Sequence, residues 1–195
     1  MRIISGKYRG RSIVPPRNLK ARPTTDFAKE NLFNVLNNIV DYEECDVLDL
    51  FSGTGSISYE FASRGAKSVT SVEVNTVHHA FIKDTARKLG CTNFYAVHAN
   101  AFLYLKNATK RFDIVFADAP YDLEGSEQIV ELVFAKDILR EEGILIFEHS
   151  AMQDFSGHPH FWQTRTYGSV NFSFFTKAAA VAQKSARADD CESEC

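Results

Sequence analysis

Short apolar runs alternate with segments of helical periodicity along most of this chain. The apolar runs are typical of buried strands, and they cover residues 46–51, 68–73, 93–97, 112–117 and 143–148. Between them, apolar residues recur at helical spacing over residues 56–64, 76–89, 101–107 and 126–137. Strands that alternate with helices in this way predict βαβ units, an α/β fold and a parallel sheet.

The alternation stops after residue 160. Two aromatic, β-prone runs at 161–167 and 169–177 are joined through Gly168 with no helix between them. Strands linked so closely pair antiparallel, so we predict an antiparallel hairpin added to the sheet. Residues 178–195 are rich in Ala, Lys, Asp, Glu and Ser, and we expect a flexible tail there.

The start of the chain has a different pattern again. Residues 2–14 alternate apolar and basic positions around glycines, which predicts a small β-hairpin that presents arginines. A Pro-Pro pair ends it, and helical spacing of apolar residues follows over residues 28–39. We therefore expect a basic N-terminal hairpin extension at residues 1–22 and the main domain at residues 23–177.

Composition narrows the classes of protein that fit. A chain of 195 residues that is 45% hydrophobic and 24% charged suits one soluble domain with a substantial core. The N-terminus has no apolar leader and no run reaches membrane-spanning length, so we expect a cytoplasmic protein. We also expect a monomer. No CxxC pair occurs among the four cysteines, so we expect neither a metal site nor a disulfide framework. The cysteines are Cys45, Cys91, Cys191 and Cys195.

Charge is unevenly distributed along the chain. Residues 1–22 contain seven Lys and Arg and no acid. The chain has 22 Lys and Arg against 25 Asp and Glu in all, so residues 23–195 carry 15 bases and all 25 acids. A basic segment on an acidic body indicates that a polyanion docks at one end. A solvated basic tail is the alternative.

A glycine-rich segment joins the first predicted strand to the helix that follows. In Asp49–Ser58, two glycines allow the backbone to turn sharply and approach a ligand closely. The segment lacks the Gly-Lys-Ser/Thr of a phosphate-binding loop, and the dinucleotide pattern GxGxxG fails at its third glycine. Asp49 could meet a cationic or amino group, and Glu73, at the end of the next strand, is placed to accept both hydroxyls of a ribose. A nucleotide-like ligand is predicted, with a tight structural turn as the alternative.

Asn100-Ala101 follows the third predicted strand at the same edge of the sheet. The Asn100 side chain could contact an adenine edge, or it could cap the helix that begins at Ala101. Both roles remain open, and they are compatible with each other.

The most informative stretch is Asp118-Ala119-Pro120-Tyr121, at the end of the fourth predicted strand. The carboxyl edge of an open α/β sheet is where ligands bind. An aromatic amine is a poor nucleophile, and acceptors on its N–H groups favour a more pyramidal, reactive nitrogen. Asp118 supplies one acceptor, and the carbonyl of Ala119 supplies another because Pro120 disfavours helical geometry before it. Tyr121 can stack on the base, which is worth about 1–3 kcal/mol in single-strand binders.

These motifs together resemble class I S-adenosylmethionine-dependent methyltransferases. Asp118–Tyr121 looks like their (Asp/Asn/Ser)-Pro-Pro-(Tyr/Phe) motif, which is found in enzymes that methylate exocyclic amino nitrogens. The segments at 2–11, 22–26 and 30–34 resemble the RsmD family, whose members methylate N2 of guanine 966 in 16S ribosomal RNA. The resemblance covers roughly residues 1–177.

The resemblance implies a Rossmann-like, seven-stranded, mostly parallel sheet with an antiparallel last strand. It implies S-adenosylmethionine as the cofactor, S-adenosylhomocysteine as the product, and 16S rRNA, the small ribosomal subunit or its assembly intermediate as the partner. The implied catalytic residues are Asp118, Ala119, Pro120 and Tyr121. The candidate cofactor-binding residues are Asp49, Phe51, Ser52, Gly53, Thr54, Gly55, Glu73, Val74, Asn100, Ala101, Arg22 and Thr24. The candidate RNA-binding residues are Arg2, Lys7, Arg9 and Arg11.

One position departs from the family pattern, because Ala119 stands where proline is usual. A carbonyl acceptor survives that exchange, although the backbone is less rigid. Rival functions with the same motif are N6-adenine and protein-glutamine methylation. Rivals of another class are a nucleotide-dependent oxidoreductase and a non-catalytic RNA-binding assembly factor for the ribosome.

Overall fold

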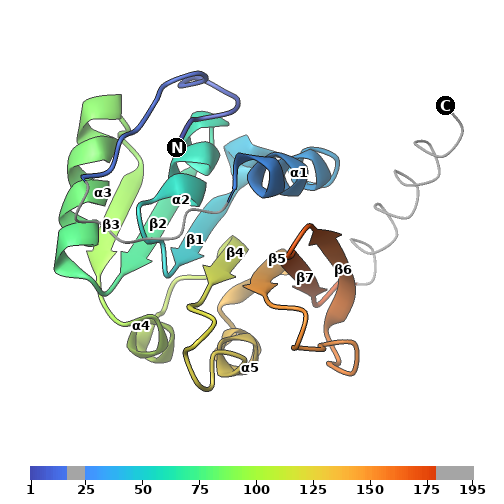
Figure 1. Cartoon of the computed structure of the whole chain (residues 1–195). Helices are drawn as coiled ribbons and strands as arrows, with labels where there is room; N and C mark the ends of the chain where they lie inside the picture. Colours follow the sequence, from blue (N-terminus) through green and yellow to red (C-terminus); the bar gives the residue numbers. More distant parts are fainter. Residues whose placement is uncertain (17–24, 179–195) are drawn as a thin grey trace, which may run out of the picture.

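A seven-stranded sheet runs through the computed structural model, which describes residues 1–16 and 25–178 (Figure 1). The strands are β1 (Asp46–Leu50), β2 (Ser68–Glu73), β3 (Phe94–His98), β4 (Phe112–Asp118), β5 (Leu139–His149), β6 (Phe161–Tyr167) and β7 (Val170–Thr176). Their order across the sheet is β3-β2-β1-β4-β5-β7-β6. The first five are parallel, whereas β7 runs antiparallel to both β5 and β6. The predicted parallel sheet with an antiparallel C-terminal hairpin is confirmed.

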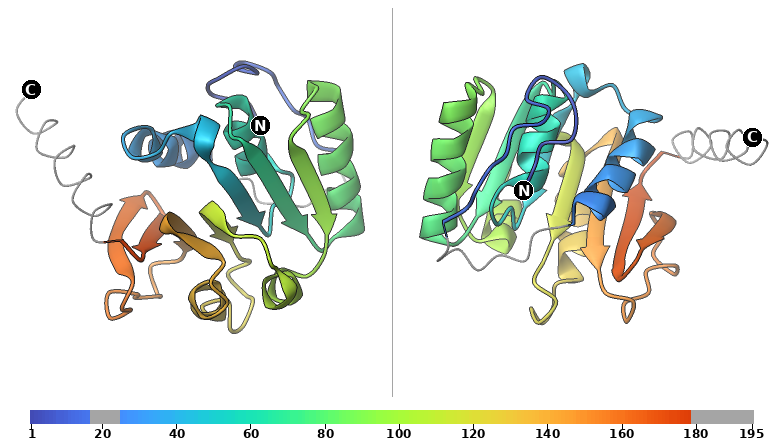
Figure 2. Two further views of the ribbon diagram at one scale, coloured as in Figure 1. Left: turned by 180° about the vertical axis from the view of Figure 1, so that it is seen from behind. Right: turned by 45° about the horizontal axis from the view of Figure 1, so that its top comes forward.

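Helices cover both faces of this sheet (Figures 1 and 2). They are α1 (Asp26–Asn37), α2 (Ser56–Ser63), α3 (Thr76–Leu89), α4 (Ala101–Asn107) and α5 (Gln128–Ala135), with a short 3₁₀ helix η1 (Tyr42–Glu44) before β1. One hydrophobic core packs α1 and α2 against the sheet, and a second packs α4 and α5 against its other face. Within the described residues, none of these helices combines the length and apolar character needed to cross a membrane.

The central strands are buried along their whole length, as covering helices on both faces require. Every residue of β1 and of β2 is buried. Acidic residues near the ends of these strands find polar partners. At the amino-terminal end, Arg140 and Lys110 both bond Asp46, at 2.7 and 2.9 Å. The carboxyl ends of the same strands carry Asp49 and Glu73, which face the other edge of the sheet.

Polar side chains begin several of the helices, and a glycine ends one of them. The Thr25 hydroxyl accepts a hydrogen bond from the Ala28 N–H at 3.1 Å and begins α1, while Asn75 caps α3 in the same way. Gly90 has a φ of 77° at the end of α3, a left-handed conformation that favours glycine. Sequence periodicity placed the last helix at 126–137, whereas α5 is shorter at both ends.

The fifth strand begins earlier than its apolar run. Leu139 already pairs with Phe112, and a register shift follows before Ile144 pairs with Ile114. The residues between Leu139 and Gly143 are polar, so the apolar run in the sequence begins only at residue 143 and does not indicate this earlier start. Arg140 belongs there because its guanidinium bonds Asp46 and Asp113 at the neighbouring strand ends.

The N-terminal hairpin is present in a reduced form. Arg2 and Ser12 form a single antiparallel bridge, and the residues between them turn over α2 rather than extending a ladder (Figure 2). Some backbone groups still bond across the segment, as the Ile3 N–H does to the Arg11 carbonyl at 3.1 Å, whereas the turn between them bonds α2: the Lys7 N–H donates to the Ser63 carbonyl at 2.6 Å. The contact is so close that a Cβ on Gly6, whose φ is 79°, would lie 1.9 Å from that carbonyl oxygen.

Apolar side chains of this segment form a third small core. Ile3, Tyr8 and Ile13 are buried against Tyr59 of α2 and Ala86 of α3. Burial of three side chains of this size stabilises the contact by several kcal/mol, at about 1.5–3 kcal/mol each. The basic segment is therefore a docked part of the structure over residues 1–13.

Candidate functional site

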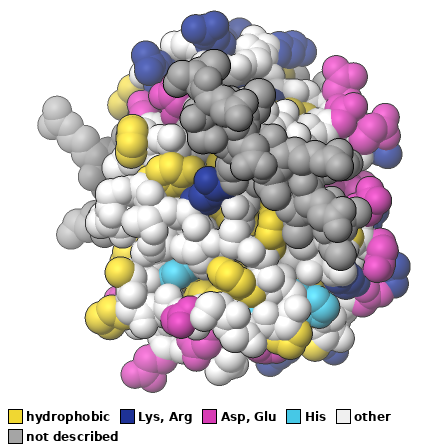
Figure 3. All heavy atoms as spheres, turned by 90° about the vertical axis from the view of Figure 1, so that its right-hand side faces the viewer, with side chains coloured by type: hydrophobic (Ala, Val, Ile, Leu, Met, Phe, Trp, Pro, Cys, Tyr) yellow, Lys and Arg dark blue, Asp and Glu magenta, His cyan; other side chains and the backbone are white. Residues whose placement is uncertain are grey.

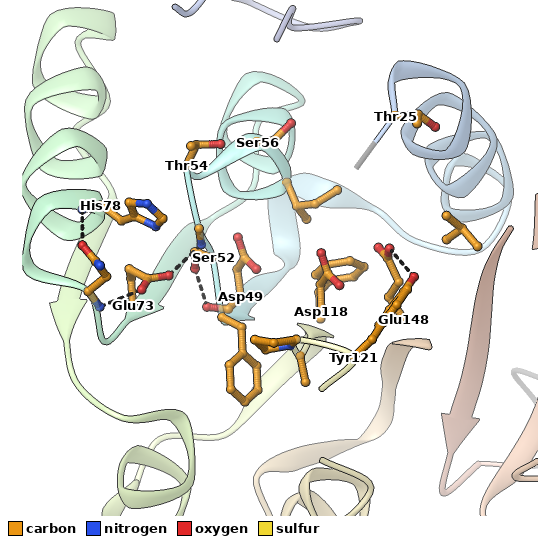
Figure 4. A pocket seen from close by; sticks show the side chains of 18 of the residues that line it. Thr25, Asp49, Ser52, Thr54, Ser56, Glu73, His78, Asp118, Tyr121 and Glu148 are labelled. Atoms are coloured by element: carbon orange, nitrogen blue, oxygen red, sulfur yellow. Dashed lines mark hydrogen bonds between the residues drawn. The ribbon is translucent and has the colours of Figure 1, made fainter. Parts of the chain in front are cut away.

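A cavity of about 840 Å³ lies at the carboxyl ends of β1, β2, β4 and β5. Its walls come from the glycine loop after β1, the residues after β2, the Asp118–Tyr121 stretch after β4, the start of α1 and the turn between β6 and β7. Figure 4 shows Glu73, Ser52 and Asp49 on one side of it and Asp118, Tyr121 and Glu148 on the other. The two sequence motifs, about seventy positions apart, thus share one cavity.

The glycine loop makes a tight turn around the end of β1. Phe51, Gly53 and Gly55 all have a positive φ, at 59°, 56° and 81°. A Cβ on Gly55 would lie 2.7 Å from the ring of Tyr59, so only glycine fits where α2 begins. Phe51 is not glycine and is strained in this conformation, a feature that clusters at ligand sites. Its ring packs edge-on to Phe102, with 6.2 Å between the centroids.

Glu73 fastens this loop to the second strand. One carboxylate oxygen accepts the Gly53 N–H at 2.8 Å, and the other accepts the Asn75 N–H at 2.7 Å. Each oxygen of an ionised carboxylate has two acceptor positions, so each retains one for a ligand. Glu73 lines the cavity although its side chain is almost fully buried. It is therefore pre-positioned to accept a pair of neighbouring hydroxyls.

Asp49 is the most deeply buried acid of the cavity, with 1% of its surface exposed. The Ser58 hydroxyl donates to its carboxylate. Burial raises the pKa of Asp49 to about 7, hydrogen bonding from Ser58 and Ser52 opposes that rise, and the charge of Asp118 adds to it. A cation bound in the cavity would favour the ionised form.

The β4 end presents its groups as the sequence predicted. Asp118 is the last residue of β4 and points into the cavity, and Ala119 after it is buried (Figure 4). Tyr121 is 47% exposed, and its hydroxyl donates to Glu148 at 3.4 Å. A carboxylate beside an accessible aromatic ring suits a planar, amino-bearing ligand.

Several cavity residues were missed in the sequence. Glu148 is the last residue but one of β5 and pairs with Asp118 at the end of β4, so a similar strand-end signal could have found it. His78 also lines the cavity, from α3. Two further wall residues, Thr25 and Ser56, belong to segments with a motif but were not predicted as site residues. The others carried no site signal, and they include Phe27, Asn75, Tyr167, Gly168 and Ser169.

Other predicted site residues lie in different places. Asn100 caps α4 by accepting the N–H groups of Phe102 and Leu103, and neither it nor Ala101 is among the cavity-lining residues. Val74 lines the cavity beside Glu73. Arg22 and Thr24 lie outside the described residues. The four candidate RNA-binding residues are exposed on the N-terminal segment and are not among the residues that line the cavity. They are Arg2, Lys7, Arg9 and Arg11. Residues 1–16 and 25–178 contain no group of three His, Cys, Asp or Glu side chains arranged to hold a metal.

Comparison with known proteins decides the family. Residues 1–176 match the family described as "Conserved hypothetical protein 95". The chain is 35% identical over 149 residues to "Ribosomal RNA small subunit methyltransferase D" of Buchnera aphidicola subsp. Baizongia pistaciae, which covers 76% of this chain and 75% of that protein. This chain belongs to the ribosomal RNA small subunit methyltransferase D family.

Further relatives of the methyltransferase D family match over nearly the full length. The protein of that name from Escherichia coli is 30% identical over 183 residues, covering 92% of this chain and 91% of its own. A solved structure, "Putative methyltransferase yhhF from Escherichia coli", superposes with a TM-score of 0.80 at 28% identity and covers 92% of this chain and 98% of its own. The fold is that of the class I methyltransferases.

Proposed function

We propose that this protein transfers a methyl group from S-adenosylmethionine to the exocyclic N2 of a guanine in 16S ribosomal RNA, at position 966 in the conventional RNA numbering. The observation that carries the proposal is the single cavity shared by the Glu73-anchored glycine loop and the Asp118–Tyr121 stretch. Membership in a family whose named relatives are small-subunit rRNA methyltransferases supports the choice of substrate.

The residues of the loop side fit the proposed cofactor. Glu73 keeps one acceptor position on each oxygen, which matches the two hydroxyls of a ribose. Asp49 is a buried carboxylate whose raised pKa falls when a cation lies nearby, which suits a sulfonium or an amino group. When bound, S-adenosylmethionine supplies an electrophilic methyl group on sulfur. The positive φ of Gly53 and of Gly55 gives the loop its tight turn, and Gly53 lines the cavity where such a ligand would lie.

The residues of the β4 side would hold the acceptor base. Asp118 accepts one N–H of the amine and the Ala119 carbonyl accepts the other, which concentrates the lone pair on nitrogen. Tyr121 stacks on the ring and fixes its plane, so the nitrogen stays aligned for in-line attack. Ala119 in place of the family's proline leaves this carbonyl available. A base reaches these groups only when it is single-stranded or flipped out of a stack.

Glu73→Ala should weaken S-adenosylmethionine binding by at least about 100-fold, because hydrogen bonds to a charged group contribute about 1.5–3 kcal/mol each and two ribose bonds are lost. The substitution also frees the Gly53 N–H that holds the loop. Calorimetric titration of the purified variant measures the change. Glu124→Ala, an exposed acid outside the cavity lining, is the matched control and should bind as the wild type does. If Glu73→Ala bound S-adenosylmethionine as tightly as the wild type does, Glu73 would not be part of the cofactor site.

The RNA would dock through the basic N-terminal segment. Lys and Arg side chains gather at the top of the face in Figure 3, the end of the molecule where this segment lies in Figure 1. The cavity itself is lined by acids, which repel phosphates. The backbone of the RNA therefore lies on the segment while one base enters the cavity.

Replacing Arg9 and Arg11 together with alanine should weaken RNA binding and flatten its dependence on salt. Each phosphate contact to single-stranded nucleic acid contributes about 0.7 to the slope of log K against log salt, so the slope should fall by about 1.4. Binding measured by filter retention over a series of salt concentrations tests this. The control pair is Lys106→Ala with Lys136→Ala, which removes two exposed lysines from α4 and the end of α5. If the arginine pair left the slope as it is in the wild type, the docking role would be wrong.

The decisive experiment is a methylation assay on naked 16S RNA, on a protein-bound assembly intermediate and on small subunits. Digestion of the products to nucleosides should yield N2-methylguanosine. If N6-methyladenosine appeared, or if a protein glutamine were methylated, the proposed substrate would be wrong. Parallel titration with S-adenosylmethionine and NAD separates the other classes: binding of NAD alone would indicate an oxidoreductase, and binding of neither would indicate an assembly factor.

A further inference from the structure

Glu148 and Asp118 lie at the carboxyl ends of neighbouring strands, Asp118 as the last residue of β4 and Glu148 as the last but one of β5. They are register partners in the parallel pair of β4 and β5, and adjacent strands lie about 4.8 Å apart. Both side chains line the cavity, and Figure 4 shows them next to each other on the side away from Glu73. The cavity therefore presents two carboxylates side by side where the base would enter.

Glu148 is costly to bury, because only 4% of its surface is exposed at the end of an apolar strand. The Tyr121 hydroxyl donates to its Oε1 at 3.4 Å, which is long for an O–H···O bond. Each oxygen of an ionised carboxylate has two acceptor positions, so Glu148 can accept from Tyr121 and also from a ligand in the cavity that it lines. A ligand that donates hydrogen bonds to both carboxylates would offset part of the cost of burying Glu148.

The Watson–Crick edges of the purines differ at the relevant atoms. Guanine presents two adjacent donors, the N1–H and the N2 amine, whereas adenine presents an amine beside an N1 that only accepts. An ionised carboxylate is an acceptor only. Two neighbouring carboxylates therefore match the donor pair of guanine and repel the N1 lone pair of adenine.

We propose that Glu148 selects guanine by accepting its N1–H while Asp118 accepts an N–H of the N2 amine. This inference rests on the proposed function and adds to it the residue that decides which base is accepted. Selection of this kind combines an attractive contact to the correct base with a repulsive one to the wrong base. Glu148 is in this account a specificity residue, separate from the acceptor that activates the amine.

The test compares two target bases in two proteins. One synthetic RNA fragment carries the guanine that the wild-type protein methylates, and a second carries 2-aminopurine there, which keeps the 2-amino group but has an N1 that only accepts. The wild type should prefer guanine in kcat/KM, and Glu148→Gln should reduce that preference by about 10- to 100-fold, because a glutamine amide can donate to N1. Affinity for the two RNAs without cofactor should change in the same direction.

The ratio between the two RNAs is internal to each protein sample, so partial unfolding of the variant does not alter it. Glu142→Gln changes an exposed glutamate at the other end of β5 and should keep the wild-type ratio. An unchanged ratio in Glu148→Gln, with guanine still methylated, would overturn the selection role alone. Failure of the wild type to methylate guanine at all would overturn the proposed function, and this inference with it.

Discussion

Replacing Asp118 with alanine should slow methyl transfer by about 10²- to 10³-fold, the loss expected when one preorganised partner of a transition state is removed. The amine lone pair then stays delocalised in the ring, because one of its two acceptors is gone. Asp118 is at the end of β4, partly exposed to the cavity, so its removal leaves the core intact. Single-turnover methylation of 16S RNA measures the rate, with calorimetry as a check that cofactor affinity changes little.

Asp122→Ala provides the matched control for this prediction. Asp122 is an exposed acid at the same cavity, four residues beyond the strand end. It should keep a rate within a few-fold of the wild type, since an exposed group on a rim contributes little preorganisation. Wild-type rates in Asp118→Ala would show that the proposed mechanism is wrong.

Replacing Glu60 with alanine should lower the free energy of unfolding by about 3–5 kcal/mol, because one member of a buried ion pair is removed and the other stays. Glu60 is fully buried and lies 3.8 Å from the ammonium of Lys29, which is also buried. Its oxygens accept the backbone N–H groups of Ile4 and Ser5, at 2.9 and 3.0 Å. Burial lowers the pKa of Lys29 and the charge of Glu60 opposes that shift.

Urea denaturation measures this loss, and a double variant sharpens it. Glu60→Leu combined with Lys29→Met removes both of these charges and should recover part of the stability, but not all of it, because Arg64 and the N–H groups of Ile4 and Ser5 also lose the carboxylate. Glu131→Ala, an exposed acid on α5, should change the free energy of unfolding by less than about 0.5 kcal/mol. A change below about 1 kcal/mol in the single variant would mean that water or relaxation compensates for the missing carboxylate.

The sequence predicted the architecture well because the signals were local. Apolar runs end in charged residues, and that boundary alone placed Glu73 and Asp118 at strand ends. What connected them was topology, since only the strand order brings the ends of β1, β2 and β4 to one cavity. The family resemblance, which the comparisons confirm, supplied the chemistry that local patterns left open.

Contacts between distant segments were the part that the sequence did not reveal. The N-terminal segment follows α2 because Glu60 bonds backbone groups 55 and 56 positions away, a pairing without any periodic signature. Glu148 carried a visible strand-end signal, yet its importance depends on its register partner Asp118. Asn100 was ambiguous between a cap and a ligand contact. The cap is present, and the adenine contact stays a prediction.

The strand order also divides the site between two halves of the chain. Residues before β4 supply the loop, Asp49 and Glu73, while residues from β4 onward supply Asp118, Tyr121 and Glu148. The boundary falls between β1 and β4, where the direction of strand addition reverses. Under the proposed function, exchange of the second half would redirect the enzyme to another base and keep its methyl donor unchanged. The same first half would then serve second halves that recognise different bases.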